Sequence, residues 1–262
     1  MAEKLSEKDI ENINIEGTEE YAVMPLRNTV LFPQQVIPIY IGREKSLKLI
    51  SDIELEKRKY IIVVAQEDGS IEDPSTEDLY SYGTLATVLK VFAMPDNSKS
   101  AIVQGIARVK ILDYLSKEPY FKAAASKVSD DPISDSLELD DIVDNLRTSF
   151  ADLIKVAPNL TEEHTGMLSN IKKPNRLVDR AVSLMTLPNQ EKQEILEEVN
   201  IKSRIDKAIS IINREIQRIK LGEEIQTEVH DEIAKTQREY YLREQMKAIQ
   251  KELGEDEGTV EL

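Results

Sequence analysis

The stretch from residue 200 to residue 253 contains no proline and a single glycine, Gly222, so little in it breaks a helix. Isoleucines recur through its first half at alternating intervals of four and three residues, the spacing of a coiled-coil seam. This seam consists of Ile205, Ile209, Ile212, Ile216 and Ile219. A continuous helix of this length would extend about 80 Å at about 1.5 Å per residue. Because no compact domain of this chain could cover such a rod, its far half should project or meet another chain.

Beyond Gly222 the seam resumes out of phase, and its main apolar mass is Tyr240 and Tyr241. Part of the isoleucine seam can pack within its own domain, but the second half has no obvious partner. We therefore predict an assembly helix that self-associates weakly through the seam and the two tyrosines. The acidic, glycine-containing residues 254–262 should form a disordered tail.

Residues 21–130 read as a β-rich domain, preceded by a flexible acidic N-terminus over residues 1–20. Three prolines between residues 21 and 41 exclude a long central strand, so short strands joined by bends are expected there. One helix is expected near residues 46–57, and a hairpin turn around residues 95–98. With so few helices, this region should form a small, curved, mostly antiparallel sheet.

From about residue 131 to residue 199 the apolar residues recur every three or four positions, which is typical of amphipathic helices. Ile142, Leu146 and Phe150 show the period, and Thr161 and Asn189 are candidate helix caps. The pattern predicts a helical bundle leading into the long helix. The predicted fold class is therefore α+β.

The composition argues against several classes of protein. Lys plus Arg total 34 and Asp plus Glu total 49, a net charge of −15, so a nucleic-acid partner is not expected. There is no cysteine, which excludes disulfides and thiolate metal sites. We find no apolar run long enough to cross a bilayer and no secretory or transit signal, so we expect a cytoplasmic location and no membrane partner.

The sequence also lacks recognisable catalytic chemistry. The nine glycines are dispersed, and none forms a phosphate-cradling loop before Lys and Ser or Thr. The two histidines, His164 and His230, are far apart, and we interpret both as solvated surface residues. We therefore assign no catalytic, cofactor-binding or metal-binding residue to this chain.

One exposed apolar surface remains as a candidate binding site. In the strand that ends near residue 94, Lys90 shares its parity with Phe92 and Met94, which should therefore face outward beside the hairpin. We predict that these two residues join Leu26, Pro33 and Pro38 in a patch that binds unfolded polypeptide. The alternative is that Phe92 and Met94 pack under a neighbouring loop.

Four segments carry a resemblance to a known family. PLRNTVLFPQQVIPIYIGR and DLYSYGTLATV resemble motifs of the N-terminal domain of bacterial Lon proteases, and QEKQEILEEVNIKSRI is similar to the end of its helical bundle. TQREYYLREQMKAIQKELGED is very similar to the segment before the Lon ATPase module. The resemblance implies a PUA-like β pseudo-barrel, a helical bundle and a long helix. In the family these precede an ATPase that uses ATP and magnesium and a Ser–Lys peptidase, assembled as a homohexamer.

Two functions are compatible with the resemblance. The first is the substrate-recognition and hexamer-supporting region of an ATP-dependent serine protease that degrades misfolded and regulatory proteins, with no catalysis and no cofactor in this chain itself. The second is a stand-alone adaptor that binds unfolded polypeptides. The last of the four segments favours the first, because a helix leading to nothing has no obvious use in an adaptor.

Overall fold

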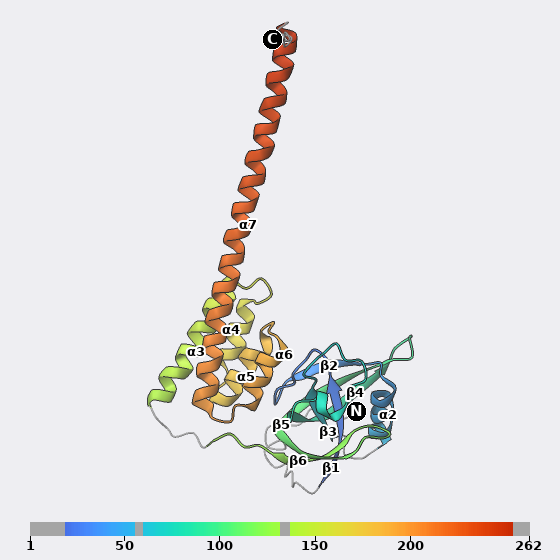
Figure 1. The fold of residues 1–262 in the computed structure, drawn as a ribbon. Coiled ribbons are helices and arrows are strands. Elements are labelled where there is room, and N and C mark those ends of the chain that lie inside the picture. Colours follow the sequence, from blue (N-terminus) through green and yellow to red (C-terminus); the bar gives the residue numbers. More distant parts are fainter. Residues whose placement is uncertain (1–18, 56–59, 132–136, 254–262) are drawn as a thin grey trace.

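The computed structural model describes residues 19–55, 60–131 and 137–253 (Figure 1). The expectations for the N-terminus before residue 19 and for the tail after residue 253 lie outside these ranges. A β-rich part and a helical bundle lie side by side, and one long helix leaves the bundle (Figure 1).

The described residues of the β-rich part form one sheet of six strands. They are β1 (Glu20–Leu26), β2 (Val36–Ile41), β3 (Tyr60–Ala65), β4 (Tyr82–Ala93), β5 (Lys99–Ser116) and β6 (Lys122–Lys127). The strand order is β2-β5-β4-β3-β1-β6, and a further pairing of β5 with β6 closes five of the strands into a ring. Of the described strand pairs, β1 with β3 is parallel and the others are antiparallel. The prediction of a curved, mostly antiparallel pseudo-barrel is confirmed.

Side chains alternate between two faces of this sheet, and each face has its own core. One cluster draws on all five strands of the ring, with Val23, Ile62, Leu85, Val109 and Ala123 as members. The other cluster covers the opposite face, where helix α2 (Glu44–Leu55) packs on the sheet. A short 3₁₀ helix, η1 (Thr76–Asp78), precedes β4.

Among the described residues, the bundle contains four helices before the long one. They are α3 (Leu137–Val156), α4 (Glu162–Ser169), α5 (Pro174–Leu184) and α6 (Asn189–Glu197). Thr161 caps α4 as predicted. His164 takes part in this cap, because its Nδ1 accepts a 3.0 Å hydrogen bond from the Thr161 backbone N–H. Asn189 is not a cap. It is the first residue of α6, and its side-chain amide donates to the Arg27 carbonyl at 2.8 Å.

The β-rich part and the bundle share a core. Val30 and Phe32, from the loop between β1 and β2, are buried in the same cluster as the bundle helices. The loop lies against β5, where a side chain on Gly105 would come within 2.3 Å of the Phe32 carbonyl oxygen. Glycine at this position therefore permits the close approach that inserts Phe32 into the bundle.

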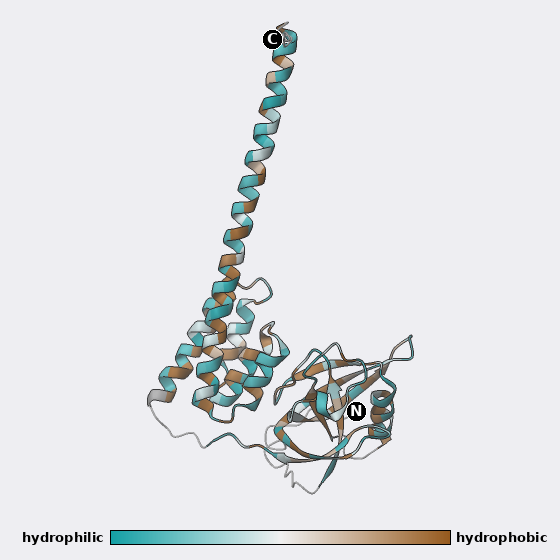
Figure 2. Ribbon diagram, viewed as in Figure 1, coloured by the Kyte–Doolittle hydropathy of each residue, from teal (hydrophilic) through white to brown (hydrophobic). Residues whose placement is uncertain are grey.

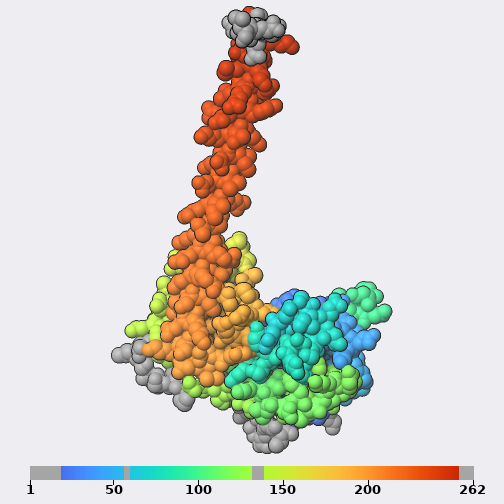
Figure 3. All heavy atoms as spheres, viewed as in Figure 1, coloured from blue at the N-terminus to red at the C-terminus, as the bar shows by residue number. Residues whose placement is uncertain are grey.

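The long helix α7 (Ile201–Glu252) has 52 residues and runs through Gly222 without a break. Its buried side chains all lie in its first third, between Ile201 and Glu215. Every described residue from Lys220 onward is exposed, and this half stands clear of the rest of the molecule (Figure 3). The predicted projecting rod is thus present, with its first part forming a wall of the bundle.

Candidate functional site

The strands β2, β5 and β4 carry aligned side chains on the face that α2 does not cover. Paired residues of antiparallel strands point to the same side of a sheet. Two rungs face outward: Pro38, Ile102 and Lys90 in the first, and Tyr40, Ser100 and Phe92 in the second. The intervening residues, such as Ile39, Ala101 and Val91, face the core under α2.

Large apolar side chains are exposed along this face. Tyr40 is 67% exposed, Met94 is 42% exposed, and Val36 and Phe92 are each 40% exposed. Pro38 is also exposed. We call these five residues the apolar strip: Val36, Pro38, Tyr40, Phe92 and Met94. It runs from the start of β2 to the tip of the β4–β5 hairpin, which projects away from the bundle (Figure 1).

Polar contacts hold the outer end of the strip in place. The Tyr40 hydroxyl donates to Asp96 at 3.2 Å, and Asp96 also accepts hydrogen bonds from the Ser98 side chain and backbone. The Ser98 hydrogen bonds are the main cause of a pKa of Asp96 below its ordinary value. The Lys90 ammonium lies 4.6 Å from the centre of the Phe92 ring. The strip therefore has a defined shape, although it is exposed.

The structure brings together three of the five predicted binding residues, Pro38, Phe92 and Met94. Leu26 does not belong with them: it is only 9% exposed and packs in the core under α2, so its inclusion in an exposed patch was wrong. Pro33 lies elsewhere, in the wall of a pocket between the sheet and the bundle. The sequence reasoning missed Val36 and Tyr40, although their alternation with partly buried Ile37 and with buried Ile39 and Ile41 is a strand signal.

A β-bulge explains why the predicted alternation of exposed and buried side chains holds only in the second half of β4. Before the bulge, Leu85 and Ala86 are both buried, on opposite faces. The register with β5 shifts between Val88 and Lys90, and from there one face is exposed. Lys90 therefore marks the outer face only beyond the bulge.

A basic pocket opens at the inner end of the strip. It has a volume of about 630 Å³ and lies between the β1–β2 loop, residues 32–36, and the α4–α5 region. Four of its lining residues are basic: Lys172, Lys173, Arg176 and Arg180. With the Gln34 amide oriented so that its oxygen faces α5, Arg176 donates two hydrogen bonds of 2.8 Å to it. Val36 lines the pocket too, so the pocket and the apolar strip are continuous.

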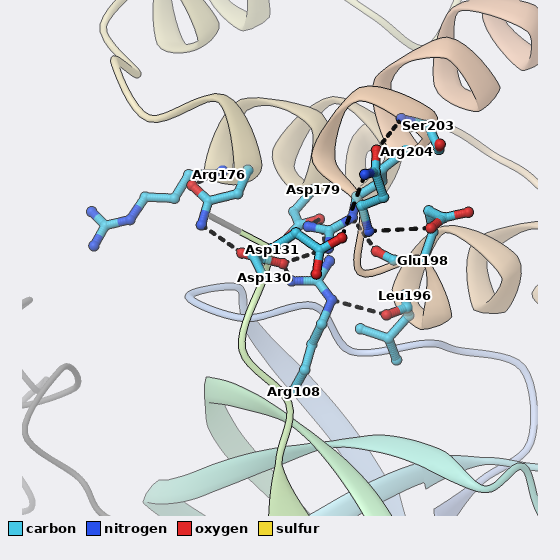
Figure 4. Close-up of polar contacts among 11 residues, drawn as sticks. Arg108, Asp130, Asp131, Arg176, Asp179, Leu196, Glu198, Ser203 and Arg204 are labelled. Carbon is cyan, nitrogen blue, oxygen red and sulfur yellow. Dashed lines mark hydrogen bonds and ion pairs between the residues drawn. The ribbon is translucent and has the colours of Figure 1, made fainter. Parts of the chain in front are cut away.

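Behind this pocket, a buried cluster of charges joins three elements (Figure 4). Arg108 of β5 donates to Asp179 of α5 at 2.5 Å and to the Leu196 carbonyl at 2.9 Å. Arg204 of α7 donates to Asp130 and to the Glu198 carbonyl, and its Nη1 lies 3.6 Å from Asp179. The cluster therefore links the sheet, the bundle and the base of the long helix.

Asp130 shows how the cluster balances burial against charge. Burial alone would raise the pKa of Asp130, but the charges of Arg204 and Arg108 and the hydrogen bonds from Asn175 and Arg204 outweigh it. The pKa of Asp130 is therefore below its ordinary value. Two arginines and two aspartates leave the cluster without net charge, as a buried group of ions requires.

The predicted assembly residues divide into two groups. Ile205 and Ile212 are fully buried against the bundle, and Ile209, Ile216 and Ile219 are partly buried there. Tyr240 and Tyr241 are 67% and 62% exposed on the projecting half. Hydrophobic residues recur along that half, interrupted by hydrophilic ones (Figure 2). The isoleucine seam is therefore mainly a bundle contact, and the tyrosines have the free surface that assembly would need.

Neither a membrane-spanning helix nor a cluster of metal ligands is present within residues 19–55, 60–131 and 137–253. None of the helices there is long and apolar enough to span a membrane. Within the same ranges, no group of three or more His, Cys, Asp or Glu residues is arranged to hold a metal ion.

Sequence comparison identifies the family. The sequence model of the family described as the ATP-dependent protease La (LON) substrate-binding domain matches residues 20–214. The chain is 41% identical to a Lon protease of Koribacter versatilis over 238 aligned residues. The aligned region covers 90% of this chain and 29% of that protein. The chain is 39% identical to a Lon protease of Dictyoglomus thermophilum, with 90% and 30% covered. The chain thus spans less than a third of the length of these curated relatives.

Solved structures share the fold. The N-terminal domain of a Mycobacterium avium complex Lon protease superposes with a TM-score of 0.61 at 19% identity, covering 74% of this chain and 98% of that one. A Lon N-terminal domain protein from Xanthomonas campestris gives a TM-score of 0.52 at 14% identity, with 73% and 98% covered. The β-rich part and the bundle therefore form an architecture that also occurs in these two proteins.

Proposed function

The chain belongs to the Lon protease family, and on that premise we propose that it is the substrate-recognition and hexamer-supporting region of an ATP-dependent protease. Its role is to hold unfolded or misfolded polypeptides for degradation. ATP, magnesium and the serine peptidase act elsewhere in the parent protein, which we place in the cytoplasm. The matched family model, which is named for substrate binding, supports this proposal.

One observation carries the recognition role: the apolar strip exposes large side chains on a rigid sheet. Unfolded chains differ from folded ones in exposing apolar side chains, so their receptor needs an exposed apolar surface of its own. Methionine adapts to many partners, as Met94 would have to do. Burying one such side chain contributes about 1.5–3 kcal/mol. After the cost of association, a few of them give affinities on the order of micromolar.

Assembly would strengthen this weak binding. Several copies of the apolar strip in one hexamer would engage a single unfolded chain at several points, which raises the overall affinity without any new contact. The projecting half of α7, with Tyr240 and Tyr241 exposed, is the part of the chain that we propose supports the assembly.

The recognition role is tested by the double substitution Phe92→Ser with Met94→Ser. Both residues are about 40% exposed, so the melting temperature should barely change. Binding to a permanently unfolded, fluorescently labelled protein, followed by anisotropy, should weaken several-fold. The matched control is Leu112→Ser with Leu115→Ser, which removes two side chains of 55% and 50% exposure outside the strip. Equal weakening in both variants would contradict a role for the strip.

A further inference from the structure

A second, acidic pocket lies where helix α6 meets the sheet, beside the end of β3 and the start of β4. Its volume is about 420 Å³. Its wall, as far as the structure describes it, contains no basic side chain and consists of Glu67, Tyr80, Gln190, Gln193, Glu194 and Glu197. Each of these side chains carries an oxygen that can accept a hydrogen bond. The acidic pocket therefore suits a ligand with a positive charge and several donors.

The glutamates on and beside α6 fall into two groups. Glu191, and Glu198 just after the helix, are each paired with a cation of α7. Glu194 and Glu197 line the acidic pocket instead, and neither forms an ion pair with any residue that the structure describes. Glu67, from the segment after β3, joins them and is likewise unpaired within the described ranges. The acidic pocket thus gathers three carboxylates for which the described part of the chain supplies no cation.

Gln193 forms the floor of the acidic pocket and is only 1% exposed. Its side-chain nitrogen donates to the Tyr82 carbonyl at 3.0 Å and to Glu197 at 2.8 Å, which fixes the orientation of the amide. Its side-chain oxygen, Oε1, is buried and accepts no hydrogen bond from the described residues. A buried carbonyl oxygen without a donor costs free energy. A ligand that donates a hydrogen bond to Oε1 would remove that cost.

Tyr80 adds an aromatic ring to the wall of the acidic pocket. It is partly buried and packs against the cores of both the sheet and the bundle. Burial raises the pKa of its hydroxyl, and the charges of Glu67, Glu197 and Glu194 raise this pKa further. The three carboxylates therefore act on one place, where their attraction for a cation adds up. An aromatic ring beside carboxylates favours a guanidinium, which stacks on rings and donates to carboxylates.

From this arrangement we infer that the acidic pocket binds the arginine side chain of a polypeptide segment. A guanidinium carries five donors in one plane, enough to engage several of these acceptors at once. A lysine ammonium has three donors and is more strongly hydrated, so it should bind less tightly. Free arginine is also a poorer occupant, because the glutamates repel its α-carboxylate, which in a peptide is an uncharged amide. This inference goes beyond the proposed function, since it needs neither the apolar strip nor assembly.

A metal ion is the other cation that a group of carboxylates can attract. Within residues 19–55, 60–131 and 137–253, no three or more His, Cys, Asp or Glu residues are arranged to hold one. Hard metal ions need oxygen ligands converging at about 2.0–2.6 Å. A guanidinium spreads its donors over a plane, so it can bridge acceptors that stand further apart. The described geometry therefore favours arginine over a metal ion.

The test uses the whole 262-residue chain, isotopically labelled, and three short peptides. Each has the sequence acetyl-Gly-Ser-X-Ser-Gly-amide, where X is arginine, lysine or citrulline, the last being an uncharged analogue of arginine. None contains a large apolar side chain, so the apolar strip does not contribute. A nuclear magnetic resonance titration follows the side-chain amide of Gln193. We expect the arginine peptide to bind about fivefold more tightly than the citrulline peptide and about twofold more tightly than the lysine peptide. Both preferences should fade at high salt.

A charge-removing variant locates the effect. The double substitution Glu67→Gln with Glu194→Gln keeps the size of both side chains, which are exposed, and spares Glu197. It should reduce the preference for arginine over citrulline to less than about twofold. The matched control is Glu224→Gln with Glu228→Gln, which makes the same change in charge on the exposed half of α7 and should keep the preference.

Three results would overturn the inference. If the arginine and citrulline peptides bind equally, or if Glu67→Gln with Glu194→Gln keeps the preference, the acidic pocket is not a guanidinium site. If free arginine binds more tightly than the arginine peptide, the occupant is an amino acid and not a polypeptide. If Mg²⁺ displaces the arginine peptide much more strongly than Na⁺ at equal ionic strength, the acidic pocket is a metal site. None of these results depends on Phe92 or Met94, so the proposed function can stand or fall separately.

Discussion

Tyr114 has a buried hydroxyl oxygen that forms no hydrogen bond within the described part of the chain. Its ring stands edge-on to Phe121, with ring centres 6.0 Å apart. Burial raises the pKa of Tyr114 to about 12, so the hydroxyl stays neutral throughout the physiological range. An unsatisfied buried hydroxyl costs free energy, while the ring itself contributes to packing.

We predict that Tyr114→Phe raises the free energy of unfolding by about 0.5–1 kcal/mol, because it removes an unpaired polar atom and keeps the ring. Urea denaturation followed by circular dichroism measures the change. Tyr240→Phe is the control, since that hydroxyl is on the exposed half of α7 and its loss should have no effect. A loss of stability in Tyr114→Phe would mean that the hydroxyl has a partner in solution.

At the same scale, the sequence could not predict the charge cluster. Asp179 stands among buried Leu177, Val178 and Ala181, and Arg204 stands beside buried Ile205. A charge inside an apolar stripe is a signal that something pairs with it. However, the partners lie up to 74 residues apart, so only the folded chain shows which charges meet.

Among the elements, the helices and strands followed their sequence periods closely, since local patterns determine them. What the pattern could not show is which partner covers a face. The isoleucine seam has the spacing of a coiled coil, yet Ile205 and Ile212 pack against the helices of their own bundle. The bulge in β4 likewise requires knowledge of the register with β5.

Gly222 is a weak point of the long helix. It lies at the start of the projecting half, and a methyl group added there would meet nothing within 4 Å. Because glycine in a helix interior costs about 1 kcal/mol relative to alanine, Gly222→Ala should stabilise the helix locally. Amide hydrogen exchange should slow around residue 222, while exchange in the bundle stays unchanged.

Gln226→Ala is the matched control, because glutamine and alanine differ little in helix propensity. It should leave exchange in the projecting half almost unaltered. If Gly222→Ala also changes nothing, contacts between chains and not local propensity hold this half of the helix, and the experiment should be repeated over a range of concentrations to find them.

At the scale of the whole molecule, the buried charge cluster makes the sheet, the bundle and α7 one unit (Figure 4). Arg108 comes from the sheet, Asp179 from α5 and Arg204 from the base of α7. The shared core around Phe32 adds apolar contact to the same junction. The sequence predicted the two parts and the rod separately, and this junction depends on contacts distant in the chain. Through it, a polypeptide held on the apolar strip would have a fixed position relative to the long helix.

The strength of this junction should depend on pH through Asp130, whose pKa is held below its ordinary value when the chain is folded. The ordinary value is about 3.9. Since the folded pKa is the lower one, the ionised carboxylate stabilises the fold fully above about pH 4, and this contribution is lost as the pH falls through the folded pKa. We predict that Asp130→Asn lowers the free energy of unfolding by about 2 kcal/mol at pH 7.

The difference in the free energy of unfolding between the unaltered chain and Asp130→Asn should then narrow progressively below about pH 4. Acid protonates Asp130 in the unaltered chain and so removes the same negative charge that the substitution removes. Urea midpoints measured from pH 7 to pH 2.5 would follow it, with tyrosine fluorescence as the probe because the chain has no tryptophan. Asp113→Asn, at an exposed position of β5, should differ little from the unaltered chain at any pH. A gap for Asp130→Asn that stays constant down to pH 2.5 would show that the charge of Asp130 contributes nothing to the junction, and that its effect comes from shape and neutral hydrogen bonds alone.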